Sequence, residues 1–319
     1  MPKTIAIIGA TGTQGGSVLN ALLPSKADYT IRAITRNPSS TAAQSLAGQG
    51  VQLVRADLHD LTSLTTAFAG THAIFAVTNF FDALPTHGVD GAMALETQMG
   101  INIAKAAAAT ESLEHFIWST LPDSQTNSDG KAAVPYYESK RRVDAFIRSL
   151  PQLLAKTTFV WVGWYSANML IPCFQPMRVR GADGYLTLTN IDPVTKIPLA
   201  GDEKVNIGVF VRAVLEQPGK TLPGRIVSAV VEYRALRDVF EAFGVAKGCR
   251  VRCVRISREE YRALWPGLAE LMDVSHHYFQ VTDGRSFTAV GEEVLGADDL
   301  GVKGLVGLEE AFERVPFPG

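Results

Sequence analysis

The chain has 319 residues, 46% of them hydrophobic and 19% charged, which is enough to build the core of one large domain or of two interleaved ones. Thirty basic and thirty-two acidic residues give a formal net charge of −2, which argues against the strongly basic face that direct nucleic-acid binding needs. Three cysteines in so long a chain form no disulfide framework.

The first residues, MPKTIAIIGATG, lead directly into a strand pattern, without the charged and apolar parts of a targeting leader. No apolar run reaches the ~18 residues that a membrane-spanning helix requires. We therefore expect a soluble, cytoplasmic protein without membrane contacts.

Short β-branched runs alternate with Ala- and Leu-rich stretches as far as residue 162. Strands are predicted at 4–8, 30–35, 52–55, 73–77, 115–118 and 158–162. Helices are predicted at 15–23, 40–48, 61–69, 91–109 and 136–150. This alternation indicates βαβ units, and strands that are apolar throughout are typical of a parallel sheet covered on both faces. The predicted fold class is therefore α/β, with a doubly wound Rossmann domain over residues 1–162.

The pattern becomes less regular over residues 163–319, where prolines separate shorter segments. We expect mainly a smaller substrate or partner domain there. A helix near 203–216 and a strand near 225–227 are predicted to return to the first sheet, so that a segment near 203–228 interleaves the two domains. Residues 124–130 (SQTNSDG) are the expected exposed loop.

The loop GATGTQGG at 9–16 lies between the first strand and the first helix. A pyrophosphate needs a backbone that it can approach without Cβ atoms, and a helix N-terminus with free N–H groups. Gly9 and Gly12 permit the tight turn, and Gly15 lets the helix pack closely on the strand. With a strand before and a helix after, the loop predicts dinucleotide binding. The loop residues assigned to the cofactor are Gly9, Thr11, Gly12, Thr13, Gln14 and Gly15.

The residue after the second strand indicates which dinucleotide is bound. NAD enzymes usually carry an acid there, whereas this chain has Arg36. A guanidinium can pair with the 2′-phosphate of NADP, which is therefore favoured, although Arg36 could also be a solvent-facing residue of the loop. Asp57, after the third strand, could accept a hydrogen bond from the adenine amino group or cap the helix that begins near Asp60.

The fourth strand ends in polar residues at the carboxyl edge of the sheet, where a cofactor binds in this fold. Thr78 and Asn79 could contact its ribose or phosphates, and Phe80 could pack near it. The alternative is a polar loop that covers a buried aromatic ring.

Tyr136 and Lys140 lie four residues apart in a predicted helix, so they share one face. A lysine ammonium beside a phenol lowers the pKa of the phenol and makes it a usable proton donor or acceptor. Ser119 ends the fifth strand at the same sheet edge and could hold a substrate oxygen. Tyr137 is a rival to Tyr136 but points about 100° away on the helix. Such a tyrosine–lysine pair is often purely structural.

Three other features are weaker candidates. His276 and His277 are adjacent, so they point apart, and no cluster of acids or cysteines joins them in a metal site. Cys249 and Cys253 have no second pair and are interpreted as half-buried strand residues rather than zinc ligands. The arginines of 250–262 alternate with apolar residues, which indicates a solvated strand face, with a protein or acidic ligand as the alternative.

These residues resemble the NmrA-like branch of the atypical short-chain dehydrogenase/reductase superfamily. The matching stretches are GATGTQGGSV at 9–18, TRNP at 35–38, GVQLVRAD at 50–57, AVTNFF at 76–81, ESKRRVDAFI at 138–147 and GWYSANML at 163–170. They cover the nucleotide domain and reach into the substrate region, whereas the last hundred residues match only loosely.

The resemblance implies NADP(H) binding through the glycines of the loop and Arg36, with further contacts near Asn79 and Lys140. It also implies that Trp164, Tyr165 and Asn168 line the substrate cleft, although packing between domains is the alternative. Some members of the family are redox sensors that bind the dinucleotide and regulate a protein partner, often without the catalytic tyrosine. Others are reductases that rely on a lysine matching Lys140, and fungal members include tailoring oxidoreductases of secondary metabolism.

Because the chain keeps both Tyr136 and Lys140, we expect an NADPH-dependent oxidoreductase. Its substrate would be a small aromatic or conjugated carbonyl or imine compound. Tyr136 would supply the proton, Lys140 would lower its pKa and position the ribose, and Ser119 would orient the acceptor oxygen. The alternative is a non-catalytic NADP(H) sensor that regulates a transcription factor or another protein, which would add a nuclear location.

Overall fold

The computed structural model describes residues 2–25, 28–181 and 183–317. Its larger part is an eight-stranded sheet in the order β13-β10-β6-β5-β4-β1-β2-β3, and every neighbouring pair is parallel. The strands are β1 (Lys3–Ile8), β2 (Tyr29–Thr35), β3 (Gln52–Arg55), β4 (Ala73–Ala76), β5 (His115–Thr120), β6 (Thr157–Val162), β10 (Arg225–Ala229) and β13 (Val294–Leu295). The strand order reverses between β1 and β4, which confirms the predicted doubly wound fold.

The helices of this part are of two kinds: those of eight or more residues lie close to their predicted positions, whereas the four-residue helices were not predicted. They are α1 (Thr13–Leu22), α2 (Thr41–Gly48), α3 (Leu61–Phe68), α4 (Leu84–Ala108), α5 (Ser124–Asn127), α6 (Pro135–Arg148), α7 (Pro151–Leu154), α8 (Glu203–Glu216) and α9 (Pro218–Thr221). Helix α4 begins earlier than expected, and its backbone is non-helical at Gly88, which separates the extra turn from the predicted helix.

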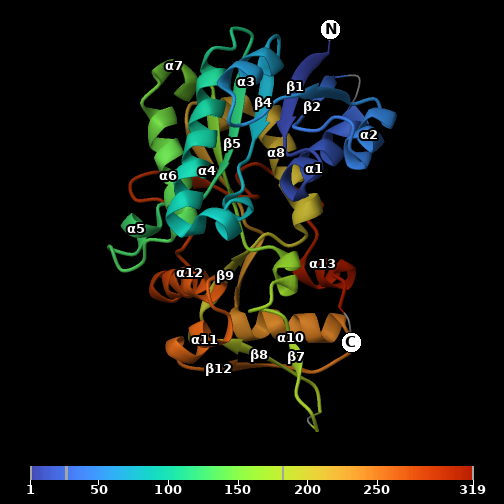
Figure 1. Ribbon diagram of the computed structural model, residues 1–319. Coiled ribbons are helices and arrows are strands. Elements are labelled where there is room, and N and C mark those ends of the chain that lie inside the picture. Colours follow the sequence, from blue (N-terminus) through green and yellow to red (C-terminus); the bar gives the residue numbers. More distant parts are fainter. Residues whose placement is uncertain (1, 26–27, 182, 318–319) are drawn as a thin grey trace.

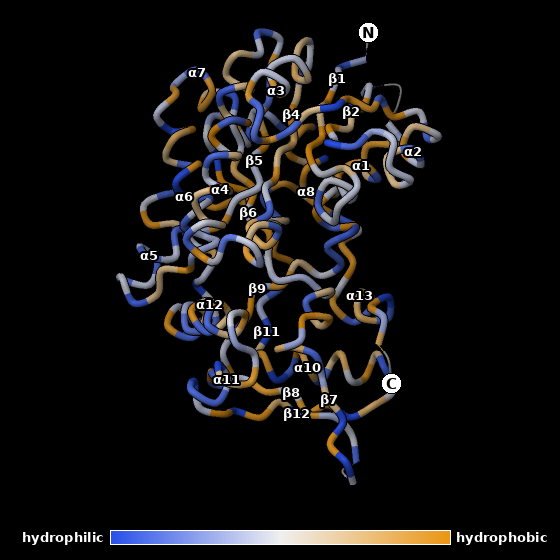
Figure 2. Tube along the Cα trace, viewed as in Figure 1, coloured by the Kyte–Doolittle hydropathy of each residue, from blue (hydrophilic) through white to orange (hydrophobic). Residues whose placement is uncertain are grey.

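The segment 124–130 is not simply the loop that its composition predicts. Its first half forms the short helix α5, because the Asp123 carboxylate accepts a hydrogen bond from the Thr126 backbone N–H and caps the turn. The segment is hydrophilic and lies at the periphery of the molecule (Figure 2).

The two faces of the sheet carry different helices, since successive residues of a strand point to opposite faces. Ile5 and Ile7 of β1 belong to one buried apolar cluster with residues of α1 and α8. Ala6 and Ile8 belong to a second cluster with residues of α3, α4 and α6. Both sides of the sheet are therefore covered, as strands that are apolar throughout require.

The remaining residues form a smaller part below the carboxyl edge of the sheet (Figure 1). Strands β7 (Met177–Arg178), β8 (Tyr185–Thr189) and β12 (Val251–Arg255) form one small sheet, and β9 (Lys196–Leu199) pairs with β11 (Glu232–Ala235). The helices are α10 (Leu236–Ala246), α11 (Arg258–Leu264), α12 (Leu268–Thr282) and α13 (Leu308–Arg314). Because β10 and β13 belong to the large sheet, the chain passes between the two parts repeatedly. The division of the chain at residue 162 stays a prediction.

Among the described residues, no helix is both long and apolar enough to cross a membrane. In β12, Arg252 and Arg255 are exposed, as the alternation at 250–262 indicates, whereas Arg258 and Arg262 form ion pairs with Asp273. Cys249 and Cys253 are half-buried free cysteines.

Candidate active site

A cleft of about 710 Å³ opens at the carboxyl ends of β1, β2 and β4. It is lined by Gly9, Thr11, Gly12, Thr13, Gln14, Gly15, Arg36, Asp57, Thr78 and Asn79, together with other residues. These are ten of the residues that the sequence assigns to the cofactor, and tertiary folding gathers them from four loops. The cleft also receives the N-terminus of α1, whose cap residue Gly12 places no side-chain oxygen on the first N–H groups. Those N–H groups are therefore free to bind an anion.

The glycine loop has the shape that a pyrophosphate requires. Gly9 has a φ of +71°, which favours glycine because an L side chain is strained there. A Cβ atom on Gly15 would lie 2.3 Å from the Gly9 carbonyl oxygen, so only glycine allows α1 to pack this closely on the loop. The residues present thus fit a dinucleotide phosphate.

Arg36 and Asp57 follow the carboxyl ends of β2 and β3. Both are exposed and both line the cleft. The capping alternative for Asp57 is wrong: Asp60 caps α3 by accepting hydrogen bonds from the N–H groups of Thr62 and Ser63. The Asp57 carboxylate accepts instead from the His59 N–H at 3.0 Å.

A second cavity, of about 230 Å³, adjoins the cleft. Its walls are rich in aromatic residues: Phe80, Phe81, Tyr136, Tyr137, Trp164, Tyr165, Phe174, Phe279 and Phe287. Gln14, Thr78, Asn79 and Tyr165 line both spaces, so the two meet along these four residues. A flat ligand in the aromatic cavity would therefore contact a ligand bound in this end of the cleft.

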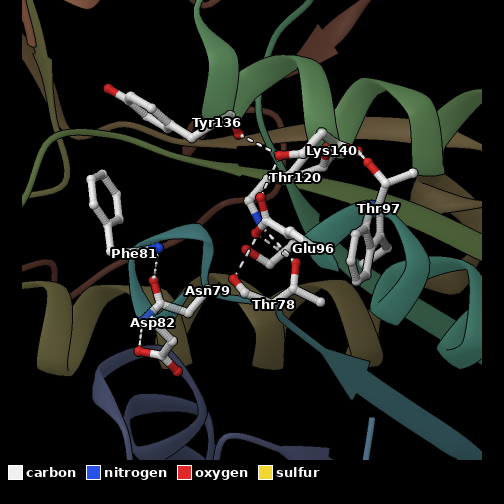
Figure 3. A network of polar contacts seen from close by, with 12 residues as sticks. Thr78, Asn79, Phe81, Asp82, Glu96, Thr97, Thr120, Tyr136 and Lys140 are labelled. Carbon is white, nitrogen blue, oxygen red and sulfur yellow. Dashed lines mark hydrogen bonds and ion pairs between the residues drawn. The ribbon is translucent and has the colours of Figure 1, made fainter. Parts of the chain in front are cut away.

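Lys140 lies at this junction, held by α4 and by the end of β4 (Figure 3). Its Nζ donates hydrogen bonds to the Thr78 carbonyl oxygen at 3.2 Å and to Thr78 Oγ1 at 3.1 Å. The same nitrogen lies 3.1 Å from Oε1 of Glu96. The Glu96 carboxylate also accepts from Thr78 Oγ1 at 2.8 Å and from Ser139 Oγ. With the Glu96 oxygen, these contacts provide an acceptor for each of the three ammonium protons of Lys140.

Tyr136 lines the same aromatic cavity, but its ring points away from Lys140 and toward Phe81 (Figure 3), with the two ring centroids 5.4 Å apart. Burial raises the pKa of Tyr136 to about 12, against a hydrogen bond with Ser275 that lowers it. The expectation that Lys140 lowers the pKa of Tyr136 is therefore wrong. Residues four apart share a helix face, but a tyrosine side chain can swing away from the helix, and here it packs among aromatic rings.

Ser119 Oγ points toward the glycine loop and donates a hydrogen bond to Gln14 Oε1 at 2.6 Å. Gln14 Nε2 in turn donates to the Tyr165 hydroxyl at 2.7 Å. Burial raises the pKa of Tyr165 above its usual value. This chain of hydrogen bonds connects the cofactor loop to the aromatic cavity.

The other assigned residues divide between the two spaces. The Asn79 side chain accepts from the Phe81 N–H and donates to Asp82, so it also shapes the turn that follows β4. Phe80 is buried and lines the aromatic cavity rather than the cleft. Trp164 and Asn168 line the aromatic cavity. The roles of all these residues stay predictions.

Glu96 is a residue of the site that none of the sequence motifs includes. Its side chain is only 1% exposed, and it belongs to a buried stripe of α4 that also contains Ala92, Gly100 and Ile103. A carboxylate at helical spacing within an apolar stripe must be buried and therefore paired. That spacing is a signal from which Glu96 could have been found.

Known proteins share both the sequence pattern and the fold. The model of the NmrA-like family matches residues 1–290. The NmrA-like family domain-containing oxidoreductase cpsB of Aspergillus campestris is 31% identical over an alignment of 296 residues, and the match covers 89% of this chain and 84% of the relative.

Two solved structures of lower identity share the fold. The structure of NmrA, a negative transcriptional regulator, in complex with NADP superposes with a TM-score of 0.73, covering 98% of this chain and 95% of that one at 21% identity. The Citrobacter sp. triphenylmethane reductase complexed with NADP(H) gives a TM-score of 0.67, covering 98% and 100% at 18% identity.

Proposed function

The chain belongs to the NmrA-like family, and from this premise we propose that it is an NADPH-dependent oxidoreductase that reduces a small aromatic or conjugated carbonyl or imine compound. The junction of the phosphate-binding cleft with the aromatic cavity carries the proposal. A reductase needs its cofactor and its substrate in contact while water is excluded, and these two spaces meet along Gln14, Thr78, Asn79 and Tyr165.

The residues of the cleft would hold the cofactor. The free N–H groups at the start of α1 would bind its pyrophosphate, and Arg36 would bind the 2′-phosphate of NADPH. When bound, NADPH supplies the electron pair and one hydrogen as a hydride. Asn79 and the ammonium of Lys140 would hold the ribose hydroxyls near the aromatic cavity.

Tyr136 would supply the proton. Its raised pKa keeps the phenol protonated at neutral pH, so it acts as an acid. Hydride addition to the carbonyl or imine carbon would break the π bond and leave its electron pair on the oxygen or nitrogen. That atom would be a stronger base than a phenolate, so it would take the phenol proton, and a proton from solvent would later restore Tyr136. The positive charge of Lys140 would stabilise the negative charge that develops on that atom. Ser119 would orient the same atom.

The named activities of similar proteins support this proposal. The relative from Aspergillus campestris is named an oxidoreductase, and the triphenylmethane reductase is a reductase with bound NADP(H). The aromatic walls of the cavity favour a flat substrate over an aliphatic one.

The test is NADPH consumption by the purified protein with a panel of aromatic ketones, enones and cyclic imines. We expect turnover that falls by about 10²–10⁴-fold in Tyr136→Phe, with the affinity for NADPH unchanged. Tyr185→Phe, which removes a phenol hydroxyl outside both cavities, is the matched control and should keep full activity.

Lys140→Met should lower both the turnover and the affinity for NADPH. Full activity in Tyr136→Phe would remove Tyr136 from the mechanism. Tight NADPH binding without turnover of any compound would contradict the proposal and favour the non-catalytic sensor.

A further inference from the structure

His276 is a polar residue that the aromatic cavity contains and that the proposed mechanism does not use. It lies on α12, which presents Met272, Ser275, His276 and Phe279 to the cavity at helical spacing. Its side chain is buried, with a relative exposure of 4%. The ring packs between Phe174 and Tyr261, with centroid distances of 5.3 and 5.7 Å. The imidazole is thus held firmly at the wall of the cavity.

A chain of hydrogen bonds determines which nitrogen of His276 carries the proton. It begins at Asp273, whose side chain is fully buried and accepts bidentate hydrogen bonds from Arg258 at 2.7 and 2.8 Å. Arg262 donates to the same carboxylate. Burial raises the pKa of Asp273, but the hydrogen bonds from Arg258, Arg262 and Asn190 together lower it below its ordinary value. Asp273 is therefore ionised and can only accept hydrogen bonds.

Asn190 connects the ionised Asp273 to His276 by hydrogen bonds. Its Nδ2 lies 2.5 Å from Asp273 Oδ1 and must donate, because the carboxylate only accepts. Its Oδ1 then faces His276 Nδ1, also at 2.5 Å, and an amide oxygen only accepts. Nδ1 must therefore carry the proton. In a neutral imidazole the other nitrogen, Nε2, then has a free lone pair.

Nε2 is left for a ligand. Within the described part of the chain, Nε2 has no hydrogen-bond partner. Protein atoms do not enclose it completely, so a ligand atom can reach it. Burial lowers the pKa of His276 to about 4, so the ring is neutral at pH 7. An acceptor in a largely apolar cavity is costly to leave unpaired, and a donor on the ligand would satisfy it.

We propose that His276 determines substrate specificity: its Nε2 accepts a hydrogen bond from an O–H or N–H group on a flat aromatic substrate. This inference rests on the proposed function for the location of the substrate. It adds a chemical requirement, namely a phenolic hydroxyl or a ring N–H in addition to the reducible group. A site built to accept a hydrogen bond discriminates strongly against a ligand that lacks the donor.

The test measures binding, so it does not depend on turnover. Isothermal titration of the NADP⁺-saturated protein would compare 4-hydroxybenzalacetone with benzalacetone, and indole-3-carbaldehyde with its N-methyl derivative. We expect the donor-bearing member of at least one pair to bind about tenfold more tightly or better. Equal affinities within both pairs, or no binding of either donor-bearing compound, would overturn the proposal without any variant.

Two substitutions test whether the Nε2 acceptor of His276, rather than the packing of its ring, causes the preference for a donor-bearing ligand. His276→Asn keeps a donor near Asn190 but removes the acceptor, so the preference should disappear. His276→Gln places an amide oxygen near the position of Nε2 and should restore it at least in part. His277→Asn, outside the aromatic cavity, is the matched control and should keep the full preference. A preference that persists in His276→Asn would assign the discrimination to another residue.

The outcome is separable from that of the proposed function. A donor preference without any NADPH consumption would support the role of His276 and contradict the reductase. Turnover of both members of each pair with equal kcat/KM and equal affinity would support the reductase and contradict the role of His276. Thermal melting of each variant shows whether the fold is intact.

Discussion

Lys140 Nζ lies 3.1 Å from Oε1 of Glu96, and the side chains of both residues are at least nine-tenths buried. The pair connects α6 to α4 at the junction of the cleft and the aromatic cavity. Without Glu96, the ammonium would be an uncompensated charge in a poorly solvated site. The carboxylate therefore holds the charge of Lys140 at the place where a substrate would be reduced.

Replacing Glu96 should be costly for the fold. We expect Glu96→Gln to lower the free energy of unfolding by about 3–5 kcal/mol, because a single partner of a buried ion pair is removed. Urea unfolding of the two proteins measures this difference. Glu216→Gln, which breaks the exposed pair with Arg212 on α8, is the control and should cost less than about 1 kcal/mol. Equal losses in the two variants would show that the Glu96–Lys140 pair is not energetically special.

Arg36 should determine the preference for the phosphorylated dinucleotide. Loss of a hydrogen bond to a charged group costs about 1.5–3 kcal/mol, so Arg36→Ala should weaken NADPH binding by about 10- to 100-fold. The affinity for NADH should change little, and fluorescence titration measures both. Arg55→Ala, at the end of β3 but outside the cleft, is the matched control. A uniform loss for both dinucleotides, or no loss, would place the 2′-phosphate elsewhere.

Two neighbouring glycines of α1 should respond differently to an added methyl group. At Gly15 the new Cβ would lie 2.3 Å from the Gly9 carbonyl oxygen, so the loop would have to move. At Gly16 the nearest atom, the Ala10 carbonyl oxygen, is 3.4 Å away. We expect Gly15→Ala to abolish measurable NADPH binding, whereas Gly16→Ala keeps it, as titration would show. Wild-type affinity in Gly15→Ala would contradict the close packing of loop and helix.

Asp144 should make stability depend on pH. It accepts hydrogen bonds from Trp118 Nε1 and Thr120 Oγ1, both at 2.8 Å, and joins α6 to β5. Burial raises its pKa to about 7, although these hydrogen bonds lower it. A carboxyl group whose pKa is raised on folding stabilises the protein fully below its unfolded pKa of about 4, and this contribution is lost as the pH rises through about 7.

Urea midpoints of the wild type and of Asp144→Asn, measured from pH 4 to pH 8, test this expectation. The wild type should lose stability relative to the variant as the pH rises. A difference that is constant over this range would mean that Asp144 ionises with an ordinary pKa.

The sequence by itself determined the fold class and the phosphate-binding loop. The alternation of strands and helices, and the glycines at 9, 12 and 15, are local patterns whose consequences follow from backbone geometry alone. For the same reason the ends of most predicted elements agree with the structure to within a few residues.

Only the tertiary structure decided which side chains act together. Helical spacing predicted a shared face for Tyr136 and Lys140, but the spacing does not fix where a long side chain turns. Residues distant in sequence decide that. The Tyr136 hydroxyl forms a hydrogen bond with Ser275 on α12, and its ring packs against Phe81. The Lys140 ammonium instead pairs with Glu96 on α4. The tautomer of His276 likewise depends on Asn190, 86 residues earlier. Such pairings come from long-range packing, which no local pattern specifies.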